Sequence, residues 1–483
     1  MPNDAPPRGG GLWKRILLGA FLIVVATAGA TSVAAFHEVK RVVNAFNESP
    51  ALQLGQSDLS TAAPGKPQTI MLLGSDARVK GASGYGGGQR SDTIILIRLD
   101  PSKKATALLS IPRDLKVSIP GHGVDKINAA YELGGAKLAL ETVKEITGLR
   151  INHVISVNFL GFADAVNQLG CVYMDIDHRY YNPGGAYAAI DLQPGYQRMC
   201  GRDALSYVRF RHTDTDIVRA SRQQQFLAQM KQQVSLGTLF GERDKLLKIF
   251  GKYTRSDIHS TSAVLRLLKL ALASAGHPIQ QIPFDGTLGA SYVYASDAQM
   301  HKMAREFIGV ESSTPATKPA PKRTSHRHKR HKHSTNPANF GLIDSSATGK
   351  QVALQAVSGG ARLPVFYPRL IGSGDTILSP PRAYDFITKQ HKHKPAYRIV
   401  VQAPGLGQYW GIQGLANFNP PILGGPHEVR HYHGQAFDVY FEGNVTRTVA
   451  WKTGHSWYWV QNTLSGVLTE DQMITIARTA QRL

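Results

Sequence analysis

Apolar strand-like segments alternate with helical segments from Gln68 to Phe307, and this alternation is the strongest constraint on the fold. The strand-like segments are rich in β-branched and large apolar residues; they are Gln68–Leu73, Thr93–Leu99, Ala105–Ile111, Ile151–Val157, Cys171–Ile176 and Ile279–Pro283. The segments with helical periodicity are Ala136–Thr147, Phe162–Leu169, Asp216–Leu236, Arg243–Tyr253, Ser260–Ala275 and Asp297–Phe307. Such an alternation predicts a three-layer α/β/α domain over residues 67–309.

An uncharged segment, residues 16–36, precedes this domain. A helix of this length spans about 30 Å, which predicts one transmembrane helix. Lys14 and Arg15 end a Pro/Gly-rich segment, 1–15, and predict a cytoplasmic N-terminus with an extracytoplasmic body. The alternative is a cleaved signal peptide, because Ala28-Gly29-Ala30 resembles a cleavage site; the apolar run continues past it and favours an anchor. We therefore expect a single-pass protein of the cell membrane, with a short stalk and linker at 37–66.

The net charge of +21, from 55 Lys and Arg against 34 Asp and Glu, indicates anionic partners: nucleic acid, a membrane surface or a phosphate-bearing substrate. No helix-turn-helix pattern is evident and the body is expected outside the membrane, so nucleic acid is not an expected partner. Residues 310–339 contain the run KRTSHRHKRHKH after a Ser/Thr/Pro-rich stretch. This composition predicts a basic disordered linker that touches wall polymers or membrane lipids.

Residues 340–483 form a second unit, in which short β-like runs are broken by Gly and Pro. A capping-box pattern at Thr469–Gln472 opens a closing helix, so we expect a small α+β domain of unknown role. Its Trp457, Tyr458 and Trp459 either stack on sugar rings or lie in the core. Because the linker predicts a tethered domain, we expect this unit to fold separately and to supply no group to the catalytic site.

Four arginines stand between Tyr207 and Gln223; they are Arg209, Arg211, Arg219 and Arg222. Arg209 and Arg211 are two residues apart and would share a face of an extended segment. Asp216, Arg219 and Gln223 share one face of a helix that begins near Asp216. Guanidinium groups beside a positive helix N-terminus suit an anion with several oxygens, such as a diphosphate. The alternative is a solvated basic helix face.

Polar residues also follow the predicted strands. Asp76 and Arg78 follow the first strand, and Arg90 and Asp92 open the second after a Gly-rich insert. Two carboxylates at strand ends can hold a hard cation through oxygen ligands. Arg113 and Asp114 end the third strand, where open α/β sheets bind ligands, and Lys126 stands in the polar loop beyond.

In this order the motifs LLGSDAR (72–78), RSDT (90–93), SIPRD (110–114), KIN (126–128), VRFR (208–211) and D-x-x-R-x-x-R-Q (216–223) resemble the LytR-CpsA-Psr family. The resemblance covers roughly residues 67–236. It implies a magnesium-dependent phosphotransferase on the outer face of the cell membrane. Such an enzyme transfers a glycopolymer, as its sugar phosphate, from a polyprenyl pyrophosphate carrier to a muramic-acid hydroxyl of peptidoglycan.

The resemblance also implies roles for individual residues. It assigns Asp76 and Asp92 to Mg²⁺. Residues that bind the diphosphate, or lie beside it, are Arg78, Arg90, Arg113, Lys126, Arg209, Arg211, Arg219 and Gln223. Catalysis would rest on Arg113, Arg209, Arg211 and Asp216.

Phosphoryl transfer needs positioning and charge neutralisation more than covalent help, which agrees with such a site. Either Asp216 or Asp114 would accept the proton of the attacking hydroxyl. An apolar slot for the polyprenyl tail would come from the helices near 136–147 and 162–169, through side chains such as Leu140, Val143, Phe159 and Phe162. Ordinary core packing is the alternative for each of these side chains.

Two alternative functions remain open. One is hydrolysis of polyprenyl pyrophosphate by water, and the other is a membrane-anchored wall-binding or regulatory protein. Cys171 and Cys200 bracket an expected extended excursion, which a disulfide would close outside the membrane; the alternative is two buried free thiols.

Overall fold

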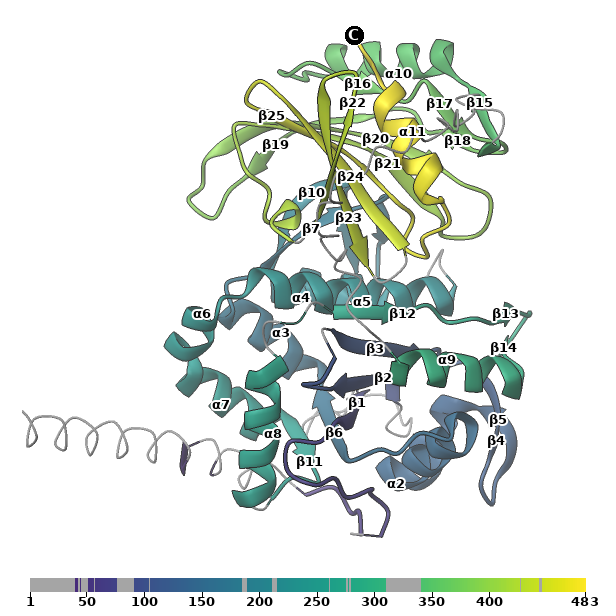
Figure 1. Ribbon diagram of the computed structural model, residues 1–483, viewed down its shortest axis with the longest axis vertical. Helices are drawn as coiled ribbons and strands as arrows, with labels where there is room; N and C mark the ends of the chain where they lie inside the picture. Colours follow the sequence, from purple (N-terminus) through teal and green to yellow (C-terminus); the bar gives the residue numbers. More distant parts are fainter. Residues whose placement is uncertain are drawn as a thin grey trace, which may run out of the picture.

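Figure 1 shows a computed structural model of the protein. It describes residues 40–41, 44, 51–55, 57–75, 91–103, 105–184, 189–210, 215–259, 261–274, 277, 279–309, 340–425, 427–442 and 445–483. The apolar segment 16–36, predicted to be a membrane anchor, lies outside these residues. Within them, no helix combines the length and apolar character needed to cross a membrane.

A mixed sheet forms the centre of the N-terminal unit. Its strands are β1 (Gln68–Ser75), β2 (Ser91–Leu99), β3 (Thr106–Ile111), β6 (His153–Asn158), β11 (Thr254–Ser256) and β12 (Ile279–Ile282). They lie in the order β11-β6-β1-β2-β3-β12. β1 is parallel to β6 and antiparallel to β2, and β3 is parallel to β12. The predicted mixed α/β class is confirmed.

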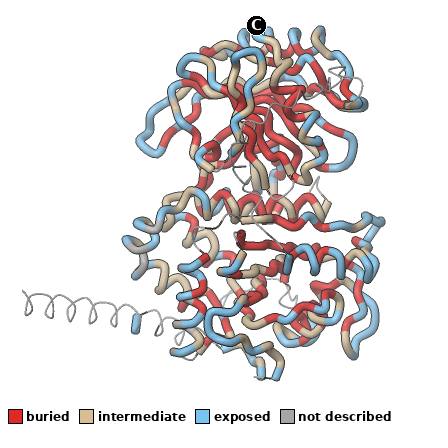
Figure 2. The backbone as a smooth tube through the Cα atoms, in the orientation of Figure 1, coloured by how far each residue is buried: buried red, intermediate tan, exposed pale blue. Residues whose placement is uncertain are grey.

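Helices lie on both faces of this sheet (Figure 1). The helices of the N-terminal unit include α2 (Ile127–Thr147), α3 (Phe159–Gln168), α4 (Gly201–Arg209), α5 (Asp216–Gln233), α6 (Leu236–Gly241), α7 (Arg243–Tyr253), α8 (Thr261–Ser274) and α9 (Asp297–Gly309). Met71 and Leu73 pack with α2 and α9 in one core, whereas Ile70 packs with Leu267 of α8 on the other face. This alternation follows from the two-residue period of a strand. Figure 2 shows the buried residues concentrated in the sheet and in the helix surfaces that face it.

Part of the expected stalk and linker, 37–66, lies on this core. Leu52, Leu54 and Leu59 pack against the α2/α9 core, and the Ser60 amide donates to the Ile151 carbonyl at 2.8 Å. Residues 51–55 and 57–60 are therefore part of the folded unit.

Helix α4 was not predicted, and it changes the place of Arg209. The Arg-x-Arg spacing suggested an extended segment, but Arg209 is the last residue of α4. Ala204, Tyr207 and Val208 are buried at a helical spacing, so tertiary packing sets the conformation. Arg211 lies outside the described residues.

Short hairpins complete the N-terminal unit. They are β4 (Lys116–Ile119) with β5 (Gly123–Lys126), β7 (Val172–Ile176) with β10 (Gly195–Met199), β8 (Tyr180–Asn182) with β9 (Ile190–Leu192), and β13 (Thr287–Leu288) with β14 (Val293–Tyr294). β7 and β10 form the expected excursion, and the sulfur atoms of Cys171 and Cys200 are bonded across its base, with a Cα–Cα distance of 4.5 Å.

The C-terminal unit is built on a second, antiparallel sheet with helices α10 (Ser346–Ser358) and α11 (Glu470–Thr479). The sheet runs β18-β20-β21-β25-β24-β23-β22, with β19 paired to β20. Its strands are β18 (Thr376–Ile377), β19 (Arg382–Ile387), β20 (His393–Gln402), β21 (Tyr409–Ala416), β22 (Glu428–Tyr432), β23 (Gln435–Glu442), β24 (Val445–Thr453) and β25 (Ser456–Gln461). The smaller elements are β15 (Leu342–Asp344), β16 (Phe366–Tyr367), β17 (Leu370–Gly372), β26 (Gln481–Arg482) and the 3-10 helix η2 (Pro421–Leu423). The capping box of Thr469 and Gln472 is present, as predicted, and Tyr458 and Trp459 are buried.

The two units are joined by a buried polar and aromatic interface. The Asp175 carboxylate on β7 accepts from Arg398 Nη1 at 2.9 Å and from Trp459 Nε1 at 2.8 Å. The side chains of Asp175 and Arg398 are both 0% exposed. Around this pair, Tyr173 and Tyr196 of the excursion pack with the aromatic rings of the C-terminal unit. The C-terminal unit is therefore docked on the N-terminal unit, which the linker did not predict, because linker composition says nothing about the surfaces that the linker connects.

We predict that Arg398→Ala lowers the free energy of unfolding by about 3–5 kcal/mol, since it leaves Asp175 buried without its charge partner. Urea denaturation followed by tryptophan fluorescence measures the change. The double variant Asp175→Leu, Arg398→Met should recover most of the loss, because it removes both buried charges together.

The matched control is Arg369→Ala, whose ion pair with Asp344 is half exposed (49% and 50%). It should change the free energy of unfolding by about 1 kcal/mol or less. An Arg398→Ala variant as stable as this control would contradict the prediction.

Candidate functional site

A cluster of charged side chains lies where β3 ends and α5 begins. Arg219 Nη2 is 2.9 Å from Asp216 Oδ1, and Lys126 Nζ is 3.1 Å from Asp114 Oδ1. Arg113 Nε lies 3.6 Å from the same Asp114 oxygen. Asp114 and Asp216 also contact one another. The predicted residues Arg113, Lys126, Asp216 and Arg219 are thus brought together, and we name them, with Asp114, the charged centre.

Backbone contacts fix the charged centre from several elements. Asp114 lies just beyond β3, after Pro112 and Arg113, and its carbonyl accepts from the Val293 amide at 2.9 Å. The neighbouring Arg113 carbonyl accepts from the Asn128 amide at the start of α2. Asp216 opens α5, whose first turn is capped by Thr215. Carboxylates and arginines therefore converge because a strand end and a helix start meet at one edge of the sheet.

Burial raises the pKa of the Asp114 carboxyl, and its contact with Asp216 raises it further. Arg113 and Lys126 oppose this rise. A carboxyl with a raised pKa is a better proton acceptor near neutral pH than an ordinary aspartate. The surroundings of Asp114, one of the two candidate bases, thus suit that role.

An apolar cavity of about 120 Å³ lies between the sheet and helices α3, α4 and α5. It is lined by Leu72, Gly74, Thr93, Ile95, Val157, Phe159, Phe162, Leu205, Val208, Arg209, Gln223, Phe226 and Leu227. The Arg209 guanidinium lies 4.1 Å from the centre of the Phe159 ring. Gln223 Nε2 donates to Thr93 Oγ1 and to the Val208 carbonyl, both at 3.1 Å. Polar groups of Arg209 and Gln223 thus stand in an otherwise apolar slot.

Phe159 and Phe162 line the apolar cavity, as predicted, whereas Leu140 and Val143 do not. Those two side chains are fully buried in the core between the sheet and α2, on the opposite face. Helical periodicity identifies a buried stripe but not the face of the sheet that the stripe covers. Leu205 and Val208 were missed, since α4 was not predicted. Phe226 was missed although its helix, α5, was predicted.

Arg222 does not join the other arginines. Its side chain is fully buried, and Nη1 donates to the carbonyls of Tyr207 at 2.7 Å and Phe210 at 3.1 Å. These carbonyls lie at the C-terminal end of α4, where a cation is favoured. Arg222 therefore holds the helix that ends in Arg209 and has a structural role.

Several predicted site residues lie outside the described residues: Asp76, Arg78, Arg90 and Arg211. Asp92 lies in β2, but its side chain is not described. Among the side chains that are described, no group of three or more His, Cys, Asp or Glu could hold a metal ion. Ser75 pairs with Ser91 in the β1–β2 ladder. Carboxylate oxygens, which the predicted ligands Asp76 and Asp92 carry, are donors that suit a hard cation.

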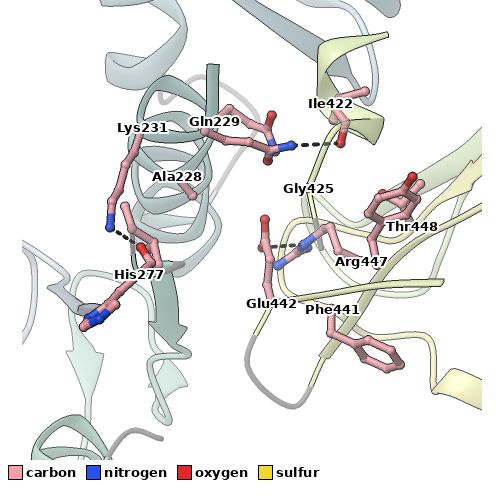
Figure 3. Close-up of a pocket in the computed structure, with 13 residues that line it drawn as sticks. Ala228, Gln229, Lys231, His277, Ile422, Gly425, Phe441, Glu442, Arg447 and Thr448 are labelled. Atoms are coloured by element: carbon pink, nitrogen blue, oxygen red, sulfur yellow. Dashed lines mark hydrogen bonds and ion pairs between the residues drawn. The ribbon is translucent and has the colours of Figure 1, made fainter. Parts of the chain in front are cut away.

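A second, larger cavity of about 290 Å³ lies between α5 and the C-terminal unit (Figure 3). Burial lowers the pKa of Lys231 to about 8, and its ammonium group donates to Thr106 Oγ1 and to the Ser274 and His277 carbonyls. Thr106 begins β3, whereas Arg113 follows its other end. The larger cavity is thus separated from the charged centre by the length of a strand.

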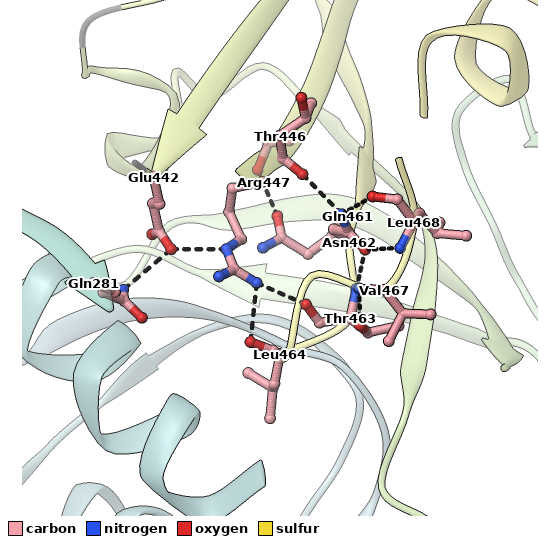
Figure 4. Close-up of polar contacts among 11 residues, drawn as sticks. Gln281, Glu442, Thr446, Arg447, Gln461, Asn462, Thr463, Leu464, Val467 and Leu468 are labelled. Carbon is pink, nitrogen blue, oxygen red and sulfur yellow. Dashed lines mark hydrogen bonds and ion pairs between the residues drawn. The ribbon is translucent and has the colours of Figure 1, made fainter. Parts of the chain in front are cut away.

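Polar groups at the wall of this second cavity bind one another. Glu442 Oε2 accepts from Arg447 Nε at 2.7 Å and from Gln281 Nε2 at 3.1 Å, and Arg447 Nη1 donates to the Thr463 carbonyl at 2.6 Å (Figure 4). Because Gln281 belongs to β12, this network also joins the two units.

We predict that Arg222→Met lowers the free energy of unfolding by about 3 kcal/mol or more, since two charge-assisted hydrogen bonds to buried carbonyls are lost. The control Arg179→Met removes an ion pair that is half exposed (50% and 49%) and should cost about 1 kcal/mol or less. Chemical denaturation compares them, and equal costs would exclude the structural role of Arg222.

The chain is similar in sequence to bacterial proteins of cell wall synthesis. The chain is 33% identical over 224 residues to the polyisoprenyl-teichoic acid–peptidoglycan teichoic acid transferase TagT of Bacillus subtilis (strain 168), covering 45% of this chain and 68% of that protein. It is 34% identical over 283 residues to the probable cell wall biosynthesis protein LcpB of Corynebacterium glutamicum, covering 56% of this chain and 63% of that protein.

A solved structure, B. subtilis TagV, is 26% identical with a TM-score of 0.40, and the match covers 51% of this chain and 98% of that chain. The chain thus spans about two thirds of the length of the two curated relatives. Residues 25–307 match the LytR_cpsA_psr family, and the C-terminal unit lies beyond this match. Since the match covers more than half of the 483 residues, the chain belongs to the LytR_cpsA_psr family.

Proposed function

We propose that the protein transfers a glycopolymer, as its sugar phosphate, from a polyprenyl pyrophosphate to a hydroxyl of peptidoglycan. The observation that carries this proposal is that helix α5 supplies both an apolar cavity and the charged centre: Gln223, in the cavity wall with Arg209, is one turn from Arg219 of the charged centre. A lipid diphosphate has one apolar and one anionic part, and the two regions suit them. Relatives named as teichoic acid transferases, TagT and TagU, support the same class of reaction.

The cavity would hold the first part of the polyprenyl chain, which places the diphosphate beside Arg209, Arg219 and Arg113. Arginine donors neutralise the phosphate oxygens as negative charge shifts toward the leaving group. Asp114 accepts the proton of the acceptor hydroxyl. The acceptor oxygen then bonds to the sugar-linked phosphorus, the bond from that phosphorus to the bridging oxygen breaks, and polyprenyl phosphate leaves.

Asp76 and Asp92 would hold a Mg²⁺ ion in this proposal. When bound, the ion would supply further positive charge to the diphosphate oxygens. The anchor at 16–36 would place the site on the outer face of the cell membrane. The bonded Cys171 and Cys200 suit that oxidising location.

The direct test incubates the protein lacking residues 1–36 with a lipid pyrophosphate glycan and soluble peptidoglycan oligomers. A phosphodiester-linked product is the expected result. Release of the sugar phosphate into water at the same rate with and without peptidoglycan would instead support a hydrolase, the alternative function.

We predict that Arg209→Ala and Arg219→Ala each lower kcat/KM at least about tenfold. A charge-assisted hydrogen bond contributes about 1.5–3 kcal/mol, and about 1.4 kcal/mol corresponds to a factor of ten. Steady-state transfer assays measure the loss, with Arg179→Ala as an unaffected surface control. Wild-type turnover by a folded Arg209→Ala, Arg219→Ala double variant would remove the diphosphate role.

We also predict that Lys126→Met moves the acidic limb of the pH profile of kcat/KM to higher pH. Lys126 lowers the pKa of Asp114, so its removal raises that pKa. Because the base acts only when deprotonated, a higher pKa means that activity appears at a higher pH. Lys126→Arg should keep the wild-type limb. A downward shift, or none, in Lys126→Met would show that Asp114 is not the titrating base.

A further inference from the structure

The β13–β14 hairpin is fixed beside the charged centre. The Val293 amide donates to the Asp114 carbonyl at 2.9 Å, and Val293 forms a parallel bridge with Leu115. Val293 itself is buried in the main core of the N-terminal unit. Figure 1 shows this hairpin close to the β4–β5 hairpin at one end of the sheet. The side chains on either side of Val293 are therefore held close to the candidate base.

Those side chains are two tyrosines in contact with two lysines. The ring centres of Tyr292 and Tyr294 are 6.2 Å apart, and Lys116 Nζ lies 5.6 Å from each ring centre. Lys126 Nζ lies 5.7 Å from the Tyr292 ring and 3.1 Å from Asp114 Oδ1. Tyr294 is 42% exposed. We call Lys116, Tyr292 and Tyr294 the tyrosine platform.

A series of neighbouring side chains connects the apolar cavity with this platform. Gln223, in the cavity wall, stands one turn of α5 from Arg219, which pairs with Asp216. Asp216 contacts Asp114, and Lys126 links Asp114 to the Tyr292 ring. The platform therefore adjoins the carboxyl pair through Lys126, whereas the cavity adjoins it through α5.

We infer that the tyrosine platform binds the acceptor, through a pyranose ring of the peptidoglycan glycan strand. This inference rests on the proposed function. The acceptor hydroxyl must reach Asp114, and the cavity side of the centre is taken by the lipid of the donor. Tyrosine rings offer an apolar face and a polar tip, which suit the C–H face and the hydroxyls of a sugar. Lys116 complements the carboxylates that peptidoglycan carries.

A platform with a purely structural role would behave differently. Substitution of its tyrosines would then change the stability of the protein and leave its use of the acceptor intact. Tyr292→Phe separates ring contact from hydroxyl contact, since it keeps the ring and its contact with the lysines.

The test uses the whole chain, with soluble uncrosslinked peptidoglycan oligomers as the acceptor and a saturating lipid pyrophosphate donor. We expect the Tyr292→Ala, Tyr294→Ala double variant to raise the acceptor KM at least tenfold, with donor binding unchanged. Tyr292→Phe should retain most acceptor affinity. Tyr181→Ala is the matched control, because Tyr181 is also exposed (48%) beneath a cation, the guanidinium of Arg179 at 4.6 Å.

Direct binding of the same oligomers, measured by calorimetry without donor, separates this inference from the proposed function. Loss of oligomer binding in the double variant supports the platform even if the wild type shows no transfer. An unchanged acceptor KM and unchanged oligomer binding in a folded double variant would overturn it. The inference would also fall if the double variant lost only its binding to anionic lipid vesicles, which would make the platform a membrane contact.

Discussion

The buried pair of Asp175 and Arg398 is the interaction on which the arrangement of the two units depends. Removing two charges from water is costly, and the cost is offset here by a short contact and by the additional donor Trp459. Among the described residues, Arg398 Nε and Nη2 have no hydrogen-bond partner, so the offset is incomplete. The pair thus favours one docking geometry rather than large net stability.

The consequences of docking extend to the site. Asp175 lies on β7, which pairs with β10, and the Cys171–Cys200 bond closes the base of this hairpin. Cys200 is the residue before α4, and the Gly201 amide donates to Asn167 Oδ1 of α3 at 2.8 Å. α4 ends in Arg209, and Arg222 holds its last carbonyls. A distant C-terminal unit therefore supports the helix that ends in Arg209, the arginine that we propose binds the diphosphate.

The sequence predicts the elements of the N-terminal unit well because their periodicity is local. The same holds for the Asp216–Arg219 pair, which needs only one helix. The sequence could not show that Arg222 has a structural role while Arg219 belongs to the charged centre, since the burial of Arg222 depends on α4, from another part of the chain. Leu140 and Val143 were predicted on the wrong side of the sheet for a related reason. Helical periodicity identifies the apolar stripe of a helix but not the face of the sheet that this stripe covers. Docking of the C-terminal unit depends on Asp175 and Arg398, which are more than two hundred positions apart. No local sequence pattern predicts such an ion pair.

The most direct test of a single docked body is to cut the chain between residues 309 and 340. A site-specific protease sequence inserted there allows cleavage after purification, and size-exclusion chromatography then reports whether the parts stay together. The interface around Asp175, Arg398 and Trp459 predicts that both fragments elute together at the position of the uncut protein. Two separate, folded fragments would contradict this account, because the C-terminal unit would then be held only by its linker.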